Sequence, residues 1–525
     1  MPATTTTQAA MHIDSLDAAT GEVIARFELT PPDAVAAVVE RARETQRQWA
    51  ATPLRARCEK LRRLRDVIHA RRQEIAEVIS REVGKPRVEA TLAEVMLAAD
   101  AAAYYAGHAP RLLRPERVPH HSLGAKAKSG WMQYEPMGVL GIISPWNFPV
   151  GITLGQIIPA LAAGNAVVLK PSEVVPWCGA LVAELVEQAG FPAGLVTVIQ
   201  GAGDVGAALV EAKPDKVIFT GSVATGRRVA EACARHLIPS VLELGGKDAM
   251  VVLADADLDV TASAAVWGAF TNCGQMCLSV ERLYVDQSIA EKFIAACVEK
   301  TRKLRAGPPS EPDTDMGPMI RPRQVAIVEE HLRDAVAQGA RVLTGGTRLP
   351  ELGETFFAPT VVVDVHHGMK LMREETFGPV LAIQVVGDTE EAIRLANDSL
   401  FALSASVWTR DSRRGREIAS RLEAGAVMVN DVASYFGICE APHGGRRSSG
   451  WGRTHSRVGM MELVQVKYID VDRLPRWPKS WWFGYSQELA VAADAGMEAM
   501  FAPDWRKRLS SVPGALRMIF RRGRV

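Results

Sequence analysis

The sequence predicts an α/β protein in which one parallel sheet is followed by a second α/β unit. Between Val139 and Leu244, short β-rich runs alternate with helical stretches. The runs are Val139–Ile143, Ala166–Leu169, Leu195–Ile199, Lys216–Phe219 and Val241–Leu244. Strands separated by helices form parallel sheets with right-handed crossovers, and ligands bind at the carboxyl ends of such strands. With 525 residues, the chain is long enough for about three domains.

Helices are expected on both sides of these strands. One begins at Thr30-Pro-Pro-Asp33, where proline in the first turn and a carboxylate near the positive end of the helix dipole are both favourable. A second helix has one apolar face, formed by Leu61, Leu64, Ile68, Ile75 and Ile79. Beyond Gly245 we expect strands near 249–253, 282–285, 360–363, 379–386 and 402–408. The helices expected there lie near 287–304, 321–338, 388–397 and 411–423.

The composition is that of an ordinary globular protein, with 48% hydrophobic residues, 23% charged residues and a net charge of +1. This balance argues against a nucleic-acid partner. Seven scattered cysteines, an odd number, favour reduced thiols in the cytoplasm over a disulfide framework. No secretory signal is recognised at the N-terminus. Residues 136–169 carry no charge, but prolines and glycines interrupt them, so we expect buried elements there and no membrane span.

Two segments carry residues suited to covalent chemistry. Phe270–Arg282 has Cys277 near its middle, after a Gly-Gln pair. Val241–Lys247 is an apolar strand with Glu243 at its end, stopped by two glycines. A thiol that attacks a carbonyl and a carboxylate that activates water are the minimum needed to make and hydrolyse a thioester. The alternative for Cys277 is a small buried core residue, whereas Glu243 would be a costly buried carboxylate without a purpose.

Four further motifs accompany these segments: Pro145-Trp-Asn-Phe-Pro149, Leu169-Lys-Pro-Ser-Glu173, Phe219-Thr-Gly-Ser222 and Glu374-Glu-Thr-Phe-Gly-Pro379. In this order, over roughly residues 15–470, the sequence resembles the aldehyde dehydrogenase superfamily. The resemblance implies an aldehyde dehydrogenase-like α/β fold with a Rossmann-type cofactor domain, an α/β catalytic domain and a small β oligomerisation element. The implied divisions are 1–117 with 137–244 for NAD(P) binding, 245–445 for catalysis, 118–136 with 460–472 for oligomerisation, and 473–525 as a C-terminal extension.

The resemblance also implies an activity, the NAD(P)-dependent, hydrolytic oxidation of a small-molecule aldehyde by a homo-oligomer, either a dimer or a tetramer. Cys277 is the implied nucleophile and Glu243 the general base for thioester hydrolysis. The Asn147 side-chain amide and the Cys277 backbone N–H would hold the oxyanion. The implied cofactor-binding residues are Trp146, Lys170, Ser172, Glu173, Gly221, Ser222, Gly226, Glu375 and Phe377.

Glu173 favours NAD as the cofactor, because a carboxylate accepts hydrogen bonds from the 2′-hydroxyl and repels a 2′-phosphate. Lys170 and Ser172 would accommodate NADP if Glu173 rotated away. Another motif, Gly201-Ala-Gly-Asp-Val-Gly206, matches G-x-G-x-x-G but follows the third strand of the set, so we interpret it as a tight turn into a helix. Cys273 has no nearby Cys/His pair at a zinc-like spacing, and we predict no metal site.

The expected substrate channel is apolar and fairly open. Its predicted residues are Phe148, Gly155, Met276, Leu278, Tyr435 and Phe436. Gly155 stands where some family members place a bulky aromatic, so we expect hydrophobic aldehydes, aliphatic or aromatic, to be preferred over short charged semialdehydes. The sequence departs from the family at Asp248, where many members carry a small polar residue, and at His443, where an aromatic is common. We expect neither residue to touch the catalytic group.

Residues 473–525 extend beyond the family pattern. They hold four of the eleven tryptophans, and from Trp505 to the end there are seven Arg or Lys and no acid. This composition is typical of a membrane-surface segment, which would make the protein peripheral to a membrane. We favour over this an arm that packs across a partner subunit and covers the channel mouth. We expect Pro503, Pro513 and Gly514 to break up any long amphipathic helix here.

Two other functions remain as alternatives to a hydrolytic dehydrogenase. A CoA-acylating member would pass the thioester to CoA, but such members tend to lack the equivalent of Glu243. A non-catalytic member would serve as a binding or structural protein, which the intact Cys277, Asn147 and Glu243 argue against.

Overall fold

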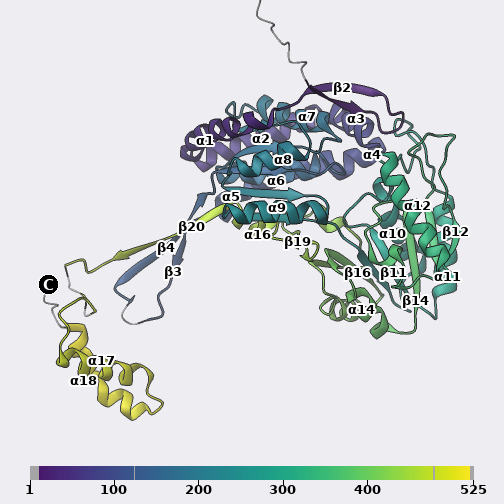
Figure 1. The fold of residues 1–525 in the computed structure, drawn as a ribbon. Helices are drawn as coiled ribbons and strands as arrows, with labels where there is room; N and C mark the ends of the chain where they lie inside the picture. Colours follow the sequence, from purple (N-terminus) through teal and green to yellow (C-terminus); the bar gives the residue numbers. More distant parts are fainter. Residues whose placement is uncertain (1–10, 123–124, 477–478, 480, 521–525) are drawn as a thin grey trace, which may run out of the picture. The chain divides into compact units, whose positions relative to one another are not determined.

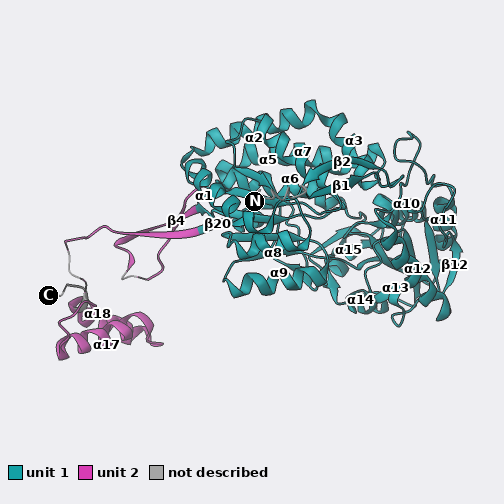
Figure 2. Ribbon diagram, turned by 45° about the horizontal axis from the view of Figure 1, so that its top comes forward, with its two compact units in different colours: residues 1–113, 135–465 teal, residues 114–134, 466–525 magenta. Residues whose placement is uncertain are grey.

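The computed structural model describes residues 11–122, 125–476, 479 and 481–520. The chain divides into two compact units, the first formed by residues 1–113 and 135–465 and the second by residues 114–134 and 466–525 (Figure 2). The first unit contains two large sheets, and the second contains a small sheet and a pair of helices.

The first sheet of unit 1 has the strand order β19-β9-β8-β5-β6-β7. Its strands are β5 (Val139–Ile143), β6 (Ala166–Lys170), β7 (Val196–Val198), β8 (Lys216–Thr220), β9 (Ser240–Glu243) and β19 (Gly450–Trp451). All neighbours are parallel except β19, which pairs antiparallel with β9. Every residue of β5 and β6 is buried, as expected for central strands covered on both faces. The five predicted strands and their parallel arrangement are therefore confirmed.

Helices enclose this sheet (Figure 1). They are α1 (Val35–Ala51), α2 (Leu54–Ala70), α3 (Arg72–Val83), α4 (Arg87–Ala90), α5 (Met96–Leu112), α6 (Gly151–Ala163), α7 (Pro176–Gln188), α8 (Gly203–Glu211) and α9 (Val223–Arg235). A π-helical turn, Thr91–Val95, joins α4 to α5, and β1 (His12–Leu16) pairs with β2 (Val23–Glu28). The single helix predicted through Leu61 and Ile79 is wrong, because Arg71 leaves the helical conformation (φ −95°, ψ 11°) and separates α2 from α3.

The second sheet of unit 1 has the order β12-β13-β14-β11-β10-β16-β17. Its strands are β10 (Asp248–Val252), β11 (Val280–Asp286), β12 (Arg341–Thr344), β13 (Thr360–Val363), β14 (Val380–Val386), β16 (Ser404–Trp408) and β17 (Ala426–Val429). Its helices are α10 (Leu258–Phe270), α11 (Ala290–Arg302), α12 (Pro322–Ala337), α13 (Lys370–Arg373), α14 (Thr389–Asn397) and α15 (Ser412–Ala419), whereas α16 (Ser456–Met461) packs against α6 of the first sheet.

Three strands of this region were not predicted as such. The edge strands β12 and β17 were missed, and the run expected over 402–408 is divided by Leu403. Its first part, β15 (Phe401–Ala402), pairs with β18 (Arg446–Arg447) outside the large sheet. The other strands of the second sheet agree with the predicted positions within a few residues.

Unit 2 holds the sheet β20-β4-β3 and a helical hairpin. The sheet consists of β3 (Glu116–Val118), β4 (Lys128–Pro136) and β20 (Val464–Asp472). Helices α17 (Gln487–Phe501) and α18 (Trp505–Phe520) lie side by side (Figure 1). A Cβ at Gly514 would come 2.6 Å from the Ala495 side chain, so the two helices approach closely there. The expected break at Pro513 and Gly514 is wrong, since α18 continues through both residues.

Candidate functional site

The predicted catalytic and cofactor residues gather at the carboxyl ends of the first sheet. Asn147 follows β5, Gly221 and Ser222 follow β8, and Glu243 ends β9. Strands β5 and β8 are neighbours, and from β5 the chain runs first outward through β6 and then returns to β8 on the other side. Such a reversal is the point at which doubly wound sheets bind their ligands. The fold therefore brings these residues to one edge.

The loop that carries Cys277 is held by side-chain amides. After α10 the chain turns sharply, with Asn272 and Cys273 both in the left-handed region (φ 50° and 55°). The Asn272 amide donates to the Gln275 carbonyl at 3.0 Å and to the Asn147 carbonyl at 3.1 Å. The Gln275 side chain donates back to the Asn272 carbonyl at 3.0 Å and accepts from the Ile320 N–H at 2.9 Å. These bonds compensate for the strained backbone and fix the loop against Asn147.

Two glycines allow the end of β9 to approach this loop. A Cβ at Gly246 would overlap the carbonyl oxygen of Cys277, and a Cβ at Gly245 would overlap the Glu375 carboxylate. The two glycines are therefore required by close packing, in addition to stopping the strand. They bring the nucleophile loop and the loop after α13 to the same place.

Asn147 is buried and has one N–H available for a ligand. Its side-chain amide donates to the Gln275 carbonyl at 3.1 Å, and a primary amide has two hydrogens. Residues just beyond it are held by Glu94, whose Oε2 accepts from the N–H groups of Val150 at 2.8 Å and Gly151 at 3.0 Å. The other Glu94 oxygen binds Lys85 Nζ at 2.6 Å, with both side chains fully buried.

Cys277 is partly buried and packs against the apolar core of the second sheet. Burial raises the pKa of its thiol, and the charges of Asp248, Glu375 and Glu243 raise it further. A hydrogen bond from its own backbone N–H lowers this pKa. The resting thiol is consequently kept protonated by its surroundings.

Glu243 is 4% exposed, and neither carboxylate oxygen has a hydrogen-bond partner among the residues that the structure describes. Burial raises the pKa of this carboxyl well above its usual value, opposed by the charge of Arg453 and assisted by that of Glu462. A buried carboxyl without partners is costly for stability. It is suited to taking a proton from a nearby water, since its basicity is high when it ionises.

One departure from the family pattern, His443, touches this group, contrary to the expectation from sequence, and the other, Asp248, acts on it through charge. His443 Nε2 lies 3.5 Å from Glu243 Oε2. Asp248 is buried at the start of β10, accepts from the Ser404 N–H at 3.0 Å, and acts electrostatically on Cys277. Burial raises the pKa of Asp248 to about 7. The sequence could not show these contacts because they join segments far apart in the chain.

Three of the expected cofactor residues, Gly221, Ser222 and Gly226, lie at the N-terminus of α9. Ser222 caps α9 by accepting from the Thr225 N–H at 3.3 Å, so the first N–H groups of α9 face the carboxyl edge of the sheet. A Cβ at Gly226 would overlap the Leu244 side chain, which shows how closely α9 packs at this point. The remaining N–H groups and the positive end of the dipole are suited to a phosphate.

Two further pairs among the expected cofactor residues contact each other. At the end of β6, Lys170 Nζ binds Glu173 Oε2 at 2.9 Å. Burial alone would raise the pKa of Glu173, but the charge and hydrogen bond of Lys170, a backbone hydrogen bond and the charge of Arg321 together outweigh it, and the net shift is downward. Trp146 and Phe377 meet edge-to-face with ring centres 5.4 Å apart. The Ser172 hydroxyl oxygen accepts from the Val174 N–H at 3.3 Å.

Glu375 is another of the expected cofactor residues. Its Oε1 accepts from the Gly246 N–H at 2.9 Å, and burial raises its pKa to about 8. The Gly201–Gly206 motif follows the edge strand β7 and leads into α8, in agreement with a tight turn into a helix. No group of three or more His, Cys, Asp or Glu that would hold a metal ion is found in the described part of the chain.

The predicted channel residues largely share one apolar cluster. Phe148, Met276, Leu278 and Tyr435 are buried members of the core of the second sheet, and Phe436 packs against it. Gly155 lies on α6, where an added Cβ would meet only His455 Nε2, at 4.0 Å. A void of about 10 Å³, also lined by Ile218, Val241 and Thr454, lies beside this glycine, and an open channel there stays a prediction.

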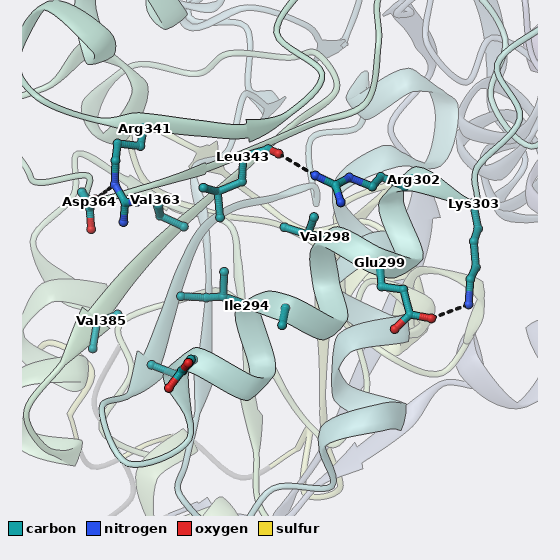
Figure 3. A pocket seen from close by; sticks show the side chains of 13 residues that line it. Ile294, Val298, Glu299, Arg302, Lys303, Arg341, Leu343, Val363, Asp364 and Val385 are labelled. Carbon is teal, nitrogen blue, oxygen red and sulfur yellow. Dashed lines mark hydrogen bonds and ion pairs between the residues drawn. The ribbon is translucent and has the colours of Figure 1, made fainter.

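A surface hollow of about 800 Å³ lies away from all of these residues. It is formed by α11 and the strands β12, β13 and β14, with an apolar floor that includes Ile294, Leu343 and Val363 (Figure 3). The Arg341–Asp364 and Lys303–Glu299 pairs lie on its rim. None of the predicted catalytic, cofactor or channel residues lines it.

Comparison with known proteins identifies the family. The sequence profile described as "Aldehyde dehydrogenase family" matches residues 4–469. The chain belongs to the aldehyde dehydrogenase family. It is accordingly an NAD(P)-dependent oxidoreductase that acts on aldehydes.

Three relatives illustrate the range within this family. A 4,4'-diapolycopene aldehyde oxidase from Methylomonas sp is 40% identical over 468 residues, which is 89% of this chain and 87% of the relative. A putative succinate-semialdehyde dehydrogenase [NADP(+)] from Mycobacterium ulcerans is 40% identical over 87% of this chain and 88% of its own. The crystal structure of an NAD-dependent aldehyde dehydrogenase from Sinorhizobium meliloti superposes with a TM-score of 0.86 at 35% identity, covering 90% of this chain and 93% of that one.

Proposed function

We propose that this aldehyde dehydrogenase oxidises a hydrophobic aldehyde to the carboxylic acid by the hydrolytic route. The observation that carries the proposal is the buried, unpartnered Glu243 carboxyl, whose charge acts on the Cys277 thiol. A thiol beside a potential general base is the arrangement needed to form a thioester and then hydrolyse it.

The residues divide the reaction between them. Cys277 Sγ passes its proton to water and adds to the aldehyde carbon, and the aldehyde oxygen becomes an alkoxide held by the Asn147 amide and the Cys277 N–H. Bound NAD(P)+ would accept the hydride that leaves this carbon. The adduct becomes a thioester on Sγ, and Glu243 takes a proton from the water that attacks it. Cleavage of the C–S bond releases the acid and returns Cys277 to its thiolate.

The cofactor would be held by residues of three strand ends. The N-terminus of α9, with Gly221, Ser222 and Gly226, is assigned to the pyrophosphate, and Lys170 with Glu173 to the adenosine ribose. Glu375 and Phe377 are assigned to the nicotinamide end. The carboxylate of Glu173 supports a preference for NAD, while the relative named for NADP(+) shows that the family also contains NADP enzymes.

We propose an apolar substrate because apolar side chains pack around Cys277. Phe148, Met276, Leu278, Tyr435 and Phe436 belong to or contact one hydrophobic cluster. The relative named as a diapolycopene aldehyde oxidase would act on a long hydrocarbon aldehyde, which agrees with this assignment. The relatives named as succinate-semialdehyde dehydrogenases support a second candidate, a short anionic aldehyde.

Initial rates of NAD(P)H formation without CoA decide between these candidates. We expect kcat/KM to increase with chain length among straight-chain aldehydes and to exceed that for succinic semialdehyde at least tenfold. Cys277→Ala should abolish the reaction, and Glu243→Gln should retain a first turnover but lose the steady state. Activity only after CoA is added would establish the acylating alternative, and no activity with any aldehyde would favour a binding protein.

We propose the domain division given by the family pattern, with 1–117 and 137–244 binding the cofactor and 245–445 carrying Cys277. The element at 118–136 and 460–472, which contains β4, β20 and the last residue of β3, is assigned to assembly of a homo-oligomer. It exposes Trp131, Val466, Tyr468, Ile469 and Val471, each at least 38% accessible. Apolar side chains of this kind on a small sheet support burial against another subunit.

The α17–α18 hairpin is assigned to a surface contact. Its apolar side chains Phe501, Trp505 and Leu509 are each more than 60% exposed, and Arg506, Lys507 and Arg508 lie beside them. No helix of the described chain is long and apolar enough to cross a bilayer. Aromatic and basic residues together favour an anionic membrane surface over a partner subunit. Removing residues after Asp472 should then abolish co-sedimentation with phosphatidylserine vesicles and leave the oligomeric state unchanged, whereas loss of the oligomer would assign the hairpin to the partner.

We further propose that the protein resides in a reducing compartment such as the cytoplasm, with any membrane contact peripheral. The seven cysteines are all free, and six of them are buried. Buried thiols without disulfide partners agree with this assignment.

A further inference from the structure

The polar side chain nearest to the Glu243 carboxyl is a histidine that the family pattern does not predict. His443 Nε2 lies 3.5 Å from Glu243 Oε2, and both side chains are about 5% exposed. Apart from this contact, the two Glu243 oxygens have no hydrogen-bond partner in the described residues. A shift of a few tenths of an ångström in either side chain brings the pair to hydrogen-bond length, as catalytic contacts commonly tighten when substrate binds.

The orientation of His443 is fixed from three directions. Its backbone N–H donates to the Thr454 carbonyl at 2.9 Å, and its carbonyl accepts from the Thr454 N–H at 2.8 Å. The Phe436 ring packs edge-to-face against the imidazole with ring centres 4.8 Å apart. Tyr435 Oη lies 2.8 Å from His443 Nδ1. Because Nδ1 is occupied by the tyrosine, Nε2 is the nitrogen that faces Glu243.

The protonation states of this pair follow from burial. Burial lowers the pKa of His443 to about 3, helped by the charges of His455 and Arg453, so the imidazole is neutral at physiological pH. Burial raises the pKa of Tyr435, so its hydroxyl keeps its proton. A hydroxyl that donates to Nδ1 leaves the single imidazole hydrogen on Nε2, which points at the carboxyl.

We propose that His443, oriented by Tyr435, is the positioning residue of Glu243: its Nε2–H donates to the carboxylate and stabilises the ionised form that acts as the base in thioester hydrolysis. The inference rests on the hydrolytic function proposed above. It assigns no role to His443 in the attack of Cys277 on the aldehyde, since that step does not require Glu243 to be ionised.

Other charges act on the same carboxyl and remain in place when His443 is changed. Arg453, next to β19, favours the ionised form of Glu243, and Glu462, after α16, disfavours it. Asp248 and Cys277 act on Tyr435 from the nucleophile side. These charges are the same in the parent enzyme and in the His443 variants, so a difference between them reports the effect of His443 on Glu243.

The test separates acylation from hydrolysis in the full-length enzyme. His443→Phe removes both nitrogens and keeps a planar ring, His443→Gln restores an N–H donor, and Tyr435→Phe removes only the group that sets the tautomer. NAD(P)H formation is followed in a stopped-flow instrument with a long-chain aldehyde, as the first-turnover burst and the steady state, across pH 5.5 to 9.5.

A matched control exists in a second tyrosine–histidine pair. Tyr284 Oη lies 2.8 Å from His367 Nε2, but this pair contacts Asp398 and none of the proposed catalytic residues. His367→Phe is expected to leave both phases within twofold of the parent enzyme. Thermal unfolding and NAD(P)H binding of every variant report on folding.

For His443→Phe we expect a burst of about one NAD(P)H per active site at a rate within twofold of the parent, followed by a steady state about tenfold slower at pH 7. Loss of a donor to the charged form raises the pKa of Glu243, so the rise of the steady-state rate with pH should move upward by about one unit. His443→Gln should recover most of both effects, and Tyr435→Phe should show them more weakly.

Three results would overturn the inference: equal loss of burst and steady state, an unchanged pH profile, or failure of His443→Gln to restore what His443→Phe removes. The first two, in a parent enzyme that oxidises aldehydes without CoA, leave the proposed function standing. A parent enzyme that forms no NAD(P)H without CoA refutes the hydrolytic function and this inference with it.

Discussion

Replacing Lys85 by methionine tests how the oxyanion residue is held in place. Lys85 Nζ and Glu94 Oε1 are 2.6 Å apart, and both side chains are fully buried. The other Glu94 oxygen accepts the N–H groups of Val150 and Gly151 at the start of α6, directly after the segment that contains Asn147. Lys85 therefore neutralises the carboxylate that anchors this segment.

The magnitude follows from burial. Removing one partner of a buried ion pair leaves an uncompensated charge and costs about 3–5 kcal/mol of unfolding free energy. Glu94→Gln should cost a similar amount, since it leaves the ammonium of Lys85 unpaired. In the double variant neither charge remains, so its loss should be at least about 2 kcal/mol smaller than the sum of the two single losses.

The activity should follow the position of Asn147. Loss of one oxyanion donor lowers the rate about 10²–10³-fold. A donor that is displaced but still present should lower the rate less, so we expect the burst of NAD(P)H to slow about tenfold in Lys85→Met. Urea unfolding monitored by circular dichroism gives the stability, and stopped-flow absorbance gives the burst. The Lys303–Glu299 pair has the same 2.6 Å separation but is 71% and 69% exposed, so Lys303→Met is the matched control and should leave the urea midpoint unchanged.

Two outcomes would refute this reasoning. If Lys85→Met and Glu94→Gln were additive in the double variant, the pair would not be coupled. If Lys85→Met lost stability but kept a normal burst, the ion pair would stabilise the fold without positioning Asn147.

Three other substitutions test separate parts of the site. If the proposed substrate channel passes Gly155, Gly155→Trp should block it and lower kcat/KM for long-chain aldehydes at least tenfold. Gly155→Ala, whose Cβ would meet only His455 Nε2 at 4.0 Å, should change it less than twofold in initial-rate assays. Glu173→Gln should raise the NADP-to-NAD ratio of kcat/KM about tenfold, because a repulsive charge next to the 2′-phosphate is removed. Asp248→Asn should lower the pKa of Cys277 and accelerate its alkylation by iodoacetamide severalfold at pH 8. Since the pKa of Asp248 is raised to about 7, this acceleration should fade below pH 6, where the parent carboxyl is already neutral.

Each of these has a result that contradicts it. Equal effects of Gly155→Ala and Gly155→Trp would show that helix packing, and not the channel, is disturbed. An unchanged cofactor ratio in Glu173→Gln would place the ribose elsewhere. Alkylation of Asp248→Asn that is faster by the same factor at pH 5.5 and pH 8 would mean that the loop has opened and that charge is not the cause.

The first sheet was predictable because each of its strands is marked locally. β5 and β6 are apolar along their whole length, as strands covered on both faces must be, and helical stretches separate them. The residues at the strand ends then follow from the rule that ligands bind there. The edge strands β12 and β17 were missed because an edge strand is only partly buried and its sequence is less distinctive.

Helix boundaries failed where tertiary contacts outweighed local preference. Arg71 separates α2 from α3 although the apolar face continues across it, and its guanidinium binds Glu74 and Glu184. At the other end of the chain, α18 continues through Pro513, where the packing of Gly514 against Ala495 compensates for a missing backbone hydrogen bond. Neither contact can be read from the local sequence.

The two tyrosine–histidine pairs show why the site itself could be predicted only in part. Tyr435 and His443 are 8 residues apart and Tyr284 and His367 are 83 apart, yet both pairs are buried or partly buried and both have 2.8 Å separations. Only the first meets a catalytic carboxyl, because β19 pairs antiparallel with β9 and the bridge between His443 and Thr454 brings the histidine beside Glu243. The sequence supplies the residue types for both pairs, but a contact across 200 positions depends on strand order. The role of a histidine in place of the family's aromatic can therefore be inferred only from the assembled sheet. A substitution of His443 should change the rate of hydrolysis, and a substitution of His367 should not.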